Sequence, residues 1–223
     1  MGISLLLLFL ILVPGILAQI GIRAALNKYS RVPARSGRSG AQAAAELMTD
    51  AGIHDVEITR TDSFLGDHYD PRTKTLALSP AVYDGRSIAA LGIAAHETGH
   101  AIQHQHAYAP LQARMAILPV TMFTSRLVFP VILIGFLLRS PTLILLGIVG
   151  YAVMMVFQLI TLPVEFNASL RAKLILQTSG LISRDEISGV NSVLNAAALT
   201  YVAALIATAA QLLRLVLLSR GRR

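Results

Sequence analysis

The chain has 223 residues, of which 54% are hydrophobic and 14% are charged, with a formal net charge of +7. This composition excludes an ordinary soluble domain, in which about 25% of residues are charged, and the basic excess is more typical of membrane topology and anionic lipid than of nucleic-acid binding. The sequence has no cysteine, which excludes disulfides, thiolate ligands and a cysteine nucleophile.

The first predicted element is a membrane anchor within residues 1–22. Residues 3–22 are almost continuously apolar, and about 20 such residues suffice to cross a bilayer. The alternative is a cleaved signal peptide, but the basic start is missing and Ile16-Leu17-Ala18 makes a poor cleavage site. Five basic residues follow between positions 23 and 38. The positive-inside rule therefore predicts an outside N-terminus and a cytoplasmic region after the anchor.

The region 23–117 begins with a predicted helix. Ser39 and Gln42 have the spacing of a capping box, and the segment that follows is rich in alanine. Gly52 is placed to end this helix.

A small β-hairpin is predicted next. Residues 56–59 alternate apolar and polar side chains, residues 75–79 form a second short strand, and Asp70-Pro71-Arg72-Thr73 between them is typical of a turn. An edge strand can pair with an extended peptide, so the second strand is either a substrate-binding edge or purely structural. The residues assigned to substrate binding are Thr75, Leu76, Ala77, Leu78 and Ser79.

The pattern His96-Glu97-x-x-His100 (HExxH) lies in a predicted helix that Ser87 caps and that runs to about His106. Residues four apart share a helix face, so both imidazoles can reach one zinc ion. Glu97 is then placed to take a proton from the water that the zinc activates and to give it to the leaving amine. The apolar, small-residue stretch before His96 predicts a buried helix, in which bare imidazoles are costly unless they are bonded or bind a metal.

Three residues are candidates for a third ligand. His104 lies about 12 Å from His96 along a continuous helix, which is too far to share an ion. His106 stands where metzincins place their third histidine, but Gln103 replaces the glycine that such a turn requires. Glu165 is the remaining candidate, and it is expected to open a helix facing the first one. Two histidines and one glutamate leave the fourth zinc position open, as a catalytic site requires.

A transmembrane hairpin is predicted over residues 118–163. Its two spans, 118–138 and 142–162, are joined by Arg139-Ser140-Pro141, which returns the chain to its starting side and lets Glu165 meet His96 and His100. Arg126 interrupts the first span. An intramembrane arginine is often functional, although snorkelling towards the membrane surface is the simpler explanation.

The third-ligand helix and a connector are assigned to residues 164–190. Here Arg171 is placed either to stabilise an oxyanion or to pair with Asp185 or Glu186. A fourth hydrophobic helix and a basic tail follow within residues 191–223. Four full crossings from an outside N-terminus would put this basic tail outside, against the positive-inside rule, so whether the last segment crosses completely stays open.

The sequence resembles the YugP-like neutral zinc metallopeptidases of bacterial membranes and, more distantly, the HtpX family. The resemblance rests on His-Glu-x-Gly-His-Ala-Ile-Gln-His, two hydrophobic spans and Leu-Pro-Val-Glu-Phe-x-Ala-Ser, and covers nearly the whole chain. It implies one Zn²⁺ per chain, with His96, His100 and Glu165 as ligands and Glu97 as the acid/base. It also includes His104, in a supporting position. The family pattern has Asp where this chain has Asn167, so a charged partner for the ligands is missing there.

We therefore predict a mostly helical, multi-pass membrane protein with a small β-hairpin beside a zincin-type HExxH helix. The predicted activity is that of a zinc endopeptidase in the bacterial plasma membrane, with its site on the cytoplasmic side. Its partners are a polypeptide substrate and the lipid bilayer, and no nucleic acid is expected. The alternative is a non-catalytic membrane scaffold with a structural zinc site. The presence of Glu97 argues against that alternative.

Overall fold

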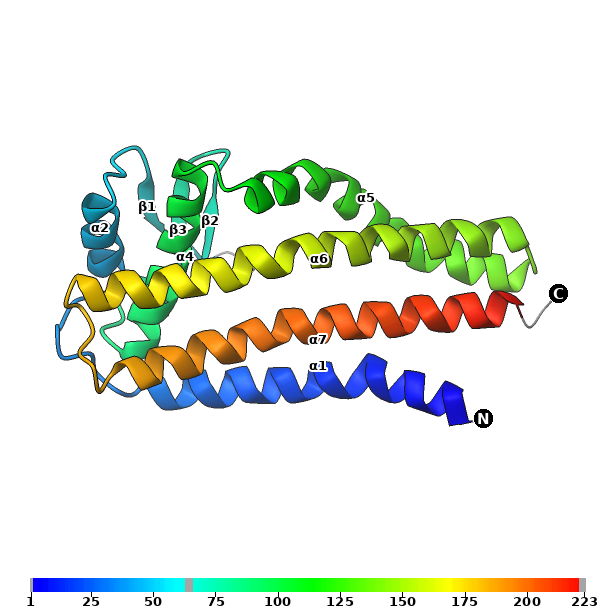
Figure 1. Ribbon diagram of the computed structural model, residues 1–223, viewed down its shortest axis with the longest axis horizontal. Helices are drawn as coiled ribbons and strands as arrows, with labels where there is room; N and C mark the ends of the chain where they lie inside the picture. Colours follow the sequence, from blue (N-terminus) through cyan, green and yellow to red (C-terminus); the bar gives the residue numbers. More distant parts are fainter. Residues whose placement is uncertain (1, 63–65, 221–223) are drawn as a thin grey trace. The chain divides into compact units, whose positions relative to one another are not determined.

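The computed structural model describes residues 2–62 and 66–220, so the last three residues of the predicted basic tail lie outside the described part. The described residues are mostly helical and include a small sheet, as predicted (Figure 1). The helices are α1 (Gly2–Tyr29), α2 (Gly40–Asp50), α3 (Pro80–Tyr83), α4 (Ile88–Gln105), α5 (Ala109–Leu137), α6 (Pro141–Thr178) and α7 (Ile187–Arg220), and the strands are β1 (Glu57–Arg60), β2 (His68–Asp70) and β3 (Thr75–Leu78).

The chain divides into two compact units. We call them the helical unit, built from residues 1–19, 112–163 and 199–223, and the mixed unit, built from residues 20–111 and 164–198. Helices α1, α5, α6 and α7 each contribute residues to both units, whereas α2, α3, α4 and the sheet belong to the mixed unit alone. All residues of the predicted metal site belong to the mixed unit.

Four of the described helices are long and apolar enough to cross a membrane: α1, α5, α6 and α7. This agrees with the four hydrophobic segments expected from the sequence. In the helical unit, α5 and α6 form the predicted antiparallel hairpin, whose link includes Arg139 in a left-handed backbone conformation (φ 49°). Gly147 and Gly150 allow the two helices to pack closely, because an added Cβ at Gly147 would lie 2.1 Å from Ile132.

Helix α6 corrects one prediction. Glu165 was expected to open a new helix after the membrane hairpin, but α6 is continuous from Pro141 to Thr178 and includes Pro163 in its interior. A proline ring removes one backbone donor and usually kinks or breaks a helix. Here the flanking residues are strongly helix-forming and apolar, and the helix continues through the proline. Glu165 is therefore held in the middle of a long helix and not at its first turn.

The sheet also differs from the predicted hairpin. Its strand order is β1-β3-β2, with β1 parallel to β3 and β2 antiparallel to β3. The true hairpin is β2–β3, whose turn is the predicted Asp70-Pro71-Arg72-Thr73 segment, and β2 was missed because it is only three residues long. Consequently β3 is the central strand and has no free edge.

The caps of the mixed unit follow the sequence. Ser39 and Gln42 form the predicted capping box of α2, and Gly52 (φ 68°) follows its end. Ser87 caps α4 by accepting the Ala90 N–H. The carboxylate of Glu186 is buried and accepts the backbone N–H groups of Arg35 and Ser183, which ties the segment before α2 to the start of α7.

Two apolar clusters enclose α4 in the mixed unit. One cluster joins α4 to α2, α6 and α7 through residues that include Leu47, Leu91, Leu176 and Val190. The other joins the opposite side of α4 to the sheet and α3. As a result, most of α4 is buried, including polar side chains that a soluble surface helix would expose. The burial of α4 is what places its histidines in the protein interior.

Candidate metal centre

The centre begins with the two histidines of α4. His96 and His100 lie one turn apart on this helix, and their ring centroids are 4.8 Å apart with the ring planes nearly perpendicular. Their side chains are only 14% and 10% exposed. The i, i+4 spacing thus gives the geometry expected from the sequence, with both rings on one face of a buried helix.

Helix α6 supplies the carboxylate. Glu165 Oε2 lies 3.2 Å from His96 Nε2 and 3.6 Å from His100 Nε2, and one donor atom from each of the three residues lies within 4.8 Å of the others. Glu165 is 2% exposed. Two imidazole nitrogens and one carboxylate oxygen are donors that suit zinc and leave a coordination position open. The residues present therefore fit the metal that the sequence predicts.

Gly99 explains how α6 comes so close to α4. A Cβ at this position would lie 2.7 Å from the backbone oxygen of Ala168, a distance that backbone atoms cannot tolerate. Ala168 lies three residues after Glu165 on the same helix. The absence of a side chain at Gly99 is thus what lets the carboxylate-bearing turn of α6 reach the two histidines.

Glu97 lies beside the cluster and is also buried. Its Oε2 accepts the backbone N–H of Tyr69, on β2, at 3.1 Å. Burial raises the pKa of Glu97, and the neighbouring His96 and His100 oppose this rise only in part. The pKa of His100 is also raised: burial by itself would lower it, but the hydrogen bond to Glu165 and the charge of Glu97 outweigh burial.

Each histidine has a second partner that the sequence analysis did not identify. His96 Nδ1 is 3.2 Å from Ser169 Oγ on α6, and His100 Nδ1 is 3.0 Å from Gln103 Oε1 on α4. Spacing offered a signal for both, because Ser169 is four residues after Glu165 and Gln103 is three residues after His100. Each position therefore shares a helix face with the ligand it supports.

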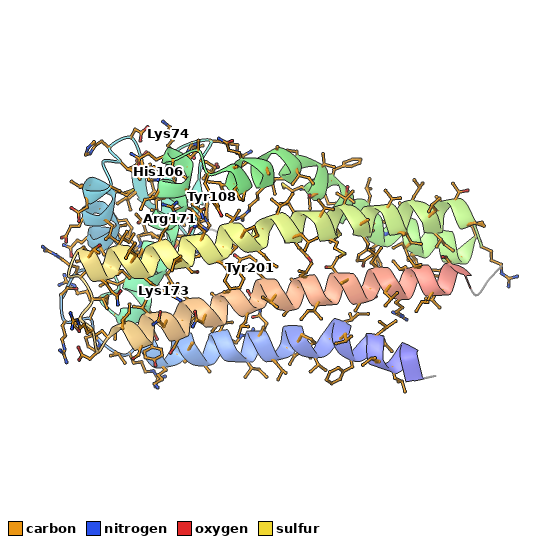
Figure 2. All side chains as sticks on the ribbon, in the orientation of Figure 1. Lys74, His106, Tyr108, Arg171, Lys173 and Tyr201 are labelled. Atoms are coloured by element: carbon orange, nitrogen blue, oxygen red, sulfur yellow. The ribbon has the colours of Figure 1, made fainter. Side chains whose placement is uncertain are left out.

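The other two histidine candidates lie apart from the cluster. His104 Nδ1 is 2.8 Å from the hydroxyl of Tyr69, so it supports the strand β2. His106 caps the C-terminus of α4 and is exposed (Figure 2). Neither belongs to the group whose donor atoms lie together.

Asn167 and Arg171 form a pair on α6. The Nε of Arg171 (labelled in Figure 2) donates to Asn167 Oδ1 at 2.8 Å. Of the alternatives for Arg171, the ion pair is wrong, because Asp185 pairs with Arg35 and Glu186 accepts the N–H groups of Arg35 and Ser183. The oxyanion role stays a prediction.

The expected substrate edge at residues 75–79 is wrong in its placement. Both edges of β3 are already paired, one with β1 and one with β2, so no further strand can add to it. Leu76, Ala77 and Leu78 are buried as well. Ser79 caps α3, and its N–H donates to Asp67.

These features define a class: a helical membrane protein in which a buried His-His-Glu group, with a further buried glutamate beside it, lies next to a small sheet. The chain belongs to the family described as "Putative neutral zinc metallopeptidase", whose model matches residues 4–220. It is 48% identical over 201 residues to the "Putative membrane protease YugP" of Bacillus subtilis (strain 168), covering 90% of this chain and 89% of that protein. No solved structure matches the chain. The family resemblance in the sequence is thereby confirmed.

Proposed function

We propose that the protein is a membrane-embedded zinc endopeptidase that hydrolyses peptide bonds of proteins in or near the membrane. The observation that carries this proposal is the buried glutamate, Glu97, beside a preassembled group of three metal donors. A structural metal site needs no such carboxylate, and burying one is costly unless it has a task or a partner.

His96, His100 and Glu165 would hold one Zn²⁺ per chain. When bound, zinc supplies a Lewis acid that polarises a carbonyl and lowers the pKa of water to about 7. The chain's own contribution is to hold the donors in place before the metal arrives. Gly99 and the packing of α4 against α6 provide that order.

Glu97 is the proposed general base and acid. Its carboxylate takes a proton from the attacking water and later delivers it to the nitrogen of the departing amine. A pKa that burial raises brings the carboxylate closer to the working pH, where accepting and releasing a proton are both favourable. The N–H of Tyr69 holds one oxygen of this carboxylate in place.

The substrate edge moves from β3 to β2 in this proposal. The Tyr69 N–H points to Glu97, so the backbone of β2 at this residue faces the site and not the ladder with β3. An extended peptide lying along this outer edge would bring its carbonyl carbon near Glu97. The β1 edge carries no printed contact to the His-His-Glu group.

The membrane assignment rests on the four long apolar helices, together with a relative named as a membrane protease. We propose a bacterial plasma membrane location with the metal site on the cytoplasmic side, because the first span is followed by basic residues.

The test uses three proteins purified in detergent with added zinc: wild type, Glu97→Gln and the exposed control Glu57→Gln. Cleavage of an unfolded model protein and bound zinc are measured on the same samples. We expect equal zinc in all three, with cleavage by wild type and Glu57→Gln only. Equal cleavage by Glu97→Gln would overturn the role of Glu97, and equal zinc with no cleavage by any of them would favour the structural-zinc scaffold.

A further inference from the structure

We propose that Gln103 is a positioning residue that fixes the proton on His100 Nδ1 and thereby presents Nε2 as the metal-binding atom. The proposal deepens the proposed zinc site and rests on it. Gln103 has no exposed surface and lies on α4, three residues after His100. A fully buried amide is costly unless all its polar atoms are bonded, and both ends of this amide are bonded.

The orientation of the Gln103 amide follows from its partners. Nε2 lies 2.8 Å from the backbone oxygen of Val164 and 3.0 Å from Asn167 Oδ1. A backbone oxygen can only accept a hydrogen bond, so the NH₂ end of Gln103 must face α6. The oxygen end must then face His100 Nδ1, at 3.0 Å.

This orientation decides where the imidazole carries its proton. An amide oxygen only accepts, so His100 Nδ1 must be the donor, whether the ring is neutral or charged. Nε2, on the other side of the ring, is then the atom that can bind an ion. Nε2 is also the atom that faces Glu165. His96 is different, because its partner Ser169 is a hydroxyl that can donate or accept and so imposes no proton position.

The same amide couples the two ligand helices. Its partners on α6 flank Glu165, since Val164 precedes this ligand and Asn167 follows it by two residues. Arg171 extends the chain of bonds, because its Nε can only donate and so fixes Oδ1 as the end of Asn167 that faces both donors. This arrangement accounts for Asn in place of the family's Asp: a single oxygen accepts both bonds, and no charge is needed for that.

The first test is zinc affinity. Wild type, Gln103→Met and the control Gln105→Met are titrated with zinc in competition with a chromophoric chelator. Methionine has nearly the length of glutamine and makes none of its hydrogen bonds, and Gln105 is an exposed residue of the same helix. We expect a loss of about 10- to 100-fold in zinc affinity for Gln103→Met, as for other supporting partners of metal ligands, and no loss for Gln105→Met. Equal affinity for all three proteins would overturn the proposal.

The second test needs no zinc and no folded variant. Metal-free wild type with ¹⁵N-labelled histidine is examined by NMR, with His100 assigned through His100→Ala. We expect Nδ1 of His100 to stay protonated from neutral to alkaline pH, and Gln103→Met to lose this preference. An unprotonated Nδ1 in wild type at alkaline pH would refute the role of Gln103.

The two tests also separate this inference from the proposed function. If wild type binds no zinc, the proposed function fails, while the proton position on His100 is still decided by NMR. If wild type binds zinc and cleaves protein but Gln103→Met binds zinc equally well, only the inference fails.

Discussion

Helices α4 and α5 are both apolar, yet they occupy opposite environments within their own units. In α4 the apolar residues are mostly small and buried, and Leu91, Ala94 and Ala95 have no exposed surface. In α5 the apolar residues are large and outward-facing: Phe123 is 68% exposed, Phe129 69% and Leu137 74%.

The difference shows that residue size and polar spacing distinguish the two environments better than hydrophobicity. Small residues let α4 be packed by protein on nearly all sides, and its polar residues are bonded inside the fold. The large side chains of α5 have no protein to cover them, which suits a lipid surface. Substituting matched residues in the two settings tests this contrast.

The largest effect is expected where a buried polar group belongs to the metal donors. Glu165→Ala removes one of three donors and should lower zinc affinity by more than about 100-fold, because loss of even a supporting partner costs about 10- to 100-fold. The exposed carboxylate Glu57 is the control, and Glu57→Ala should leave affinity unchanged. Zinc content is measured after dialysis at fixed free zinc. Full occupancy in Glu165→Ala would remove Glu165 from the ligand set.

Leucine truncation compares the apolar faces directly. Leu91→Ala should destabilise the protein by about 2–5 kcal/mol, because it leaves a cavity in a packed core, whereas Leu137→Ala should cost less than about 0.5 kcal/mol, as at an exposed site. The two are compared by thermal unfolding in the same detergent. Equal midpoints would mean that α4 is not packed as described.

Glycine substitution tests the close approach of α4 and α6. Gly99→Ala forces a Cβ against the backbone of Ala168 and should cost about 1–3 kcal/mol, the usual range for overpacking. It should also weaken zinc binding, because the two sets of donors are pushed apart. At Gly21 an added Cβ meets nothing within 4 Å, so Gly21→Ala should be neutral or slightly stabilising. Unfolding and zinc titration of both variants check this, and wild-type zinc affinity in Gly99→Ala would argue against the clash.

The smallest effect concerns Tyr69, which is half-buried beside α4. Burial raises the pKa of Tyr69 to about 12 from its ordinary value of 10.0. The folded protein then holds this proton more tightly than the unfolded chain, so stability falls as the pH rises from about 10 to about 12. Absorbance titration of the tyrosines should show one late phase that Tyr69→Phe removes. A late phase that persists in Tyr69→Phe belongs to another residue.

Much of the site could be predicted because it depends on local periodicity. The spacing of His96, Glu97 and His100 determines a shared helix face, and the caps Ser39 and Ser87 begin helices where expected. Long apolar runs likewise predicted the four membrane-length helices, although the helices extend beyond the apolar runs because polar residues can continue a helix once it has begun.

The errors arose where tertiary contacts decide the structure. Strand order depends on pairing between distant segments, and no local pattern distinguishes the central β3 from an edge. The continuity of α6 through Pro163 is a balance between a local penalty and a long helix on both sides. Gln103 was considered only for the glycine it replaces, and its role depends on Val164 and Asn167, more than 60 residues away in sequence.

The separation of the donors along the chain has a consequence for folding. His96 and Glu165 are 69 residues apart in sequence, so an ion that both of them bind closes a loop of that length. A cross-link over such a loop removes about 4 kcal/mol of chain entropy from the unfolded ensemble in the simplest polymer description. This chain has no cysteine and therefore cannot be stapled by a disulfide. A metal ion joining α4 to α6 would act as its reversible staple, and chelation would open it.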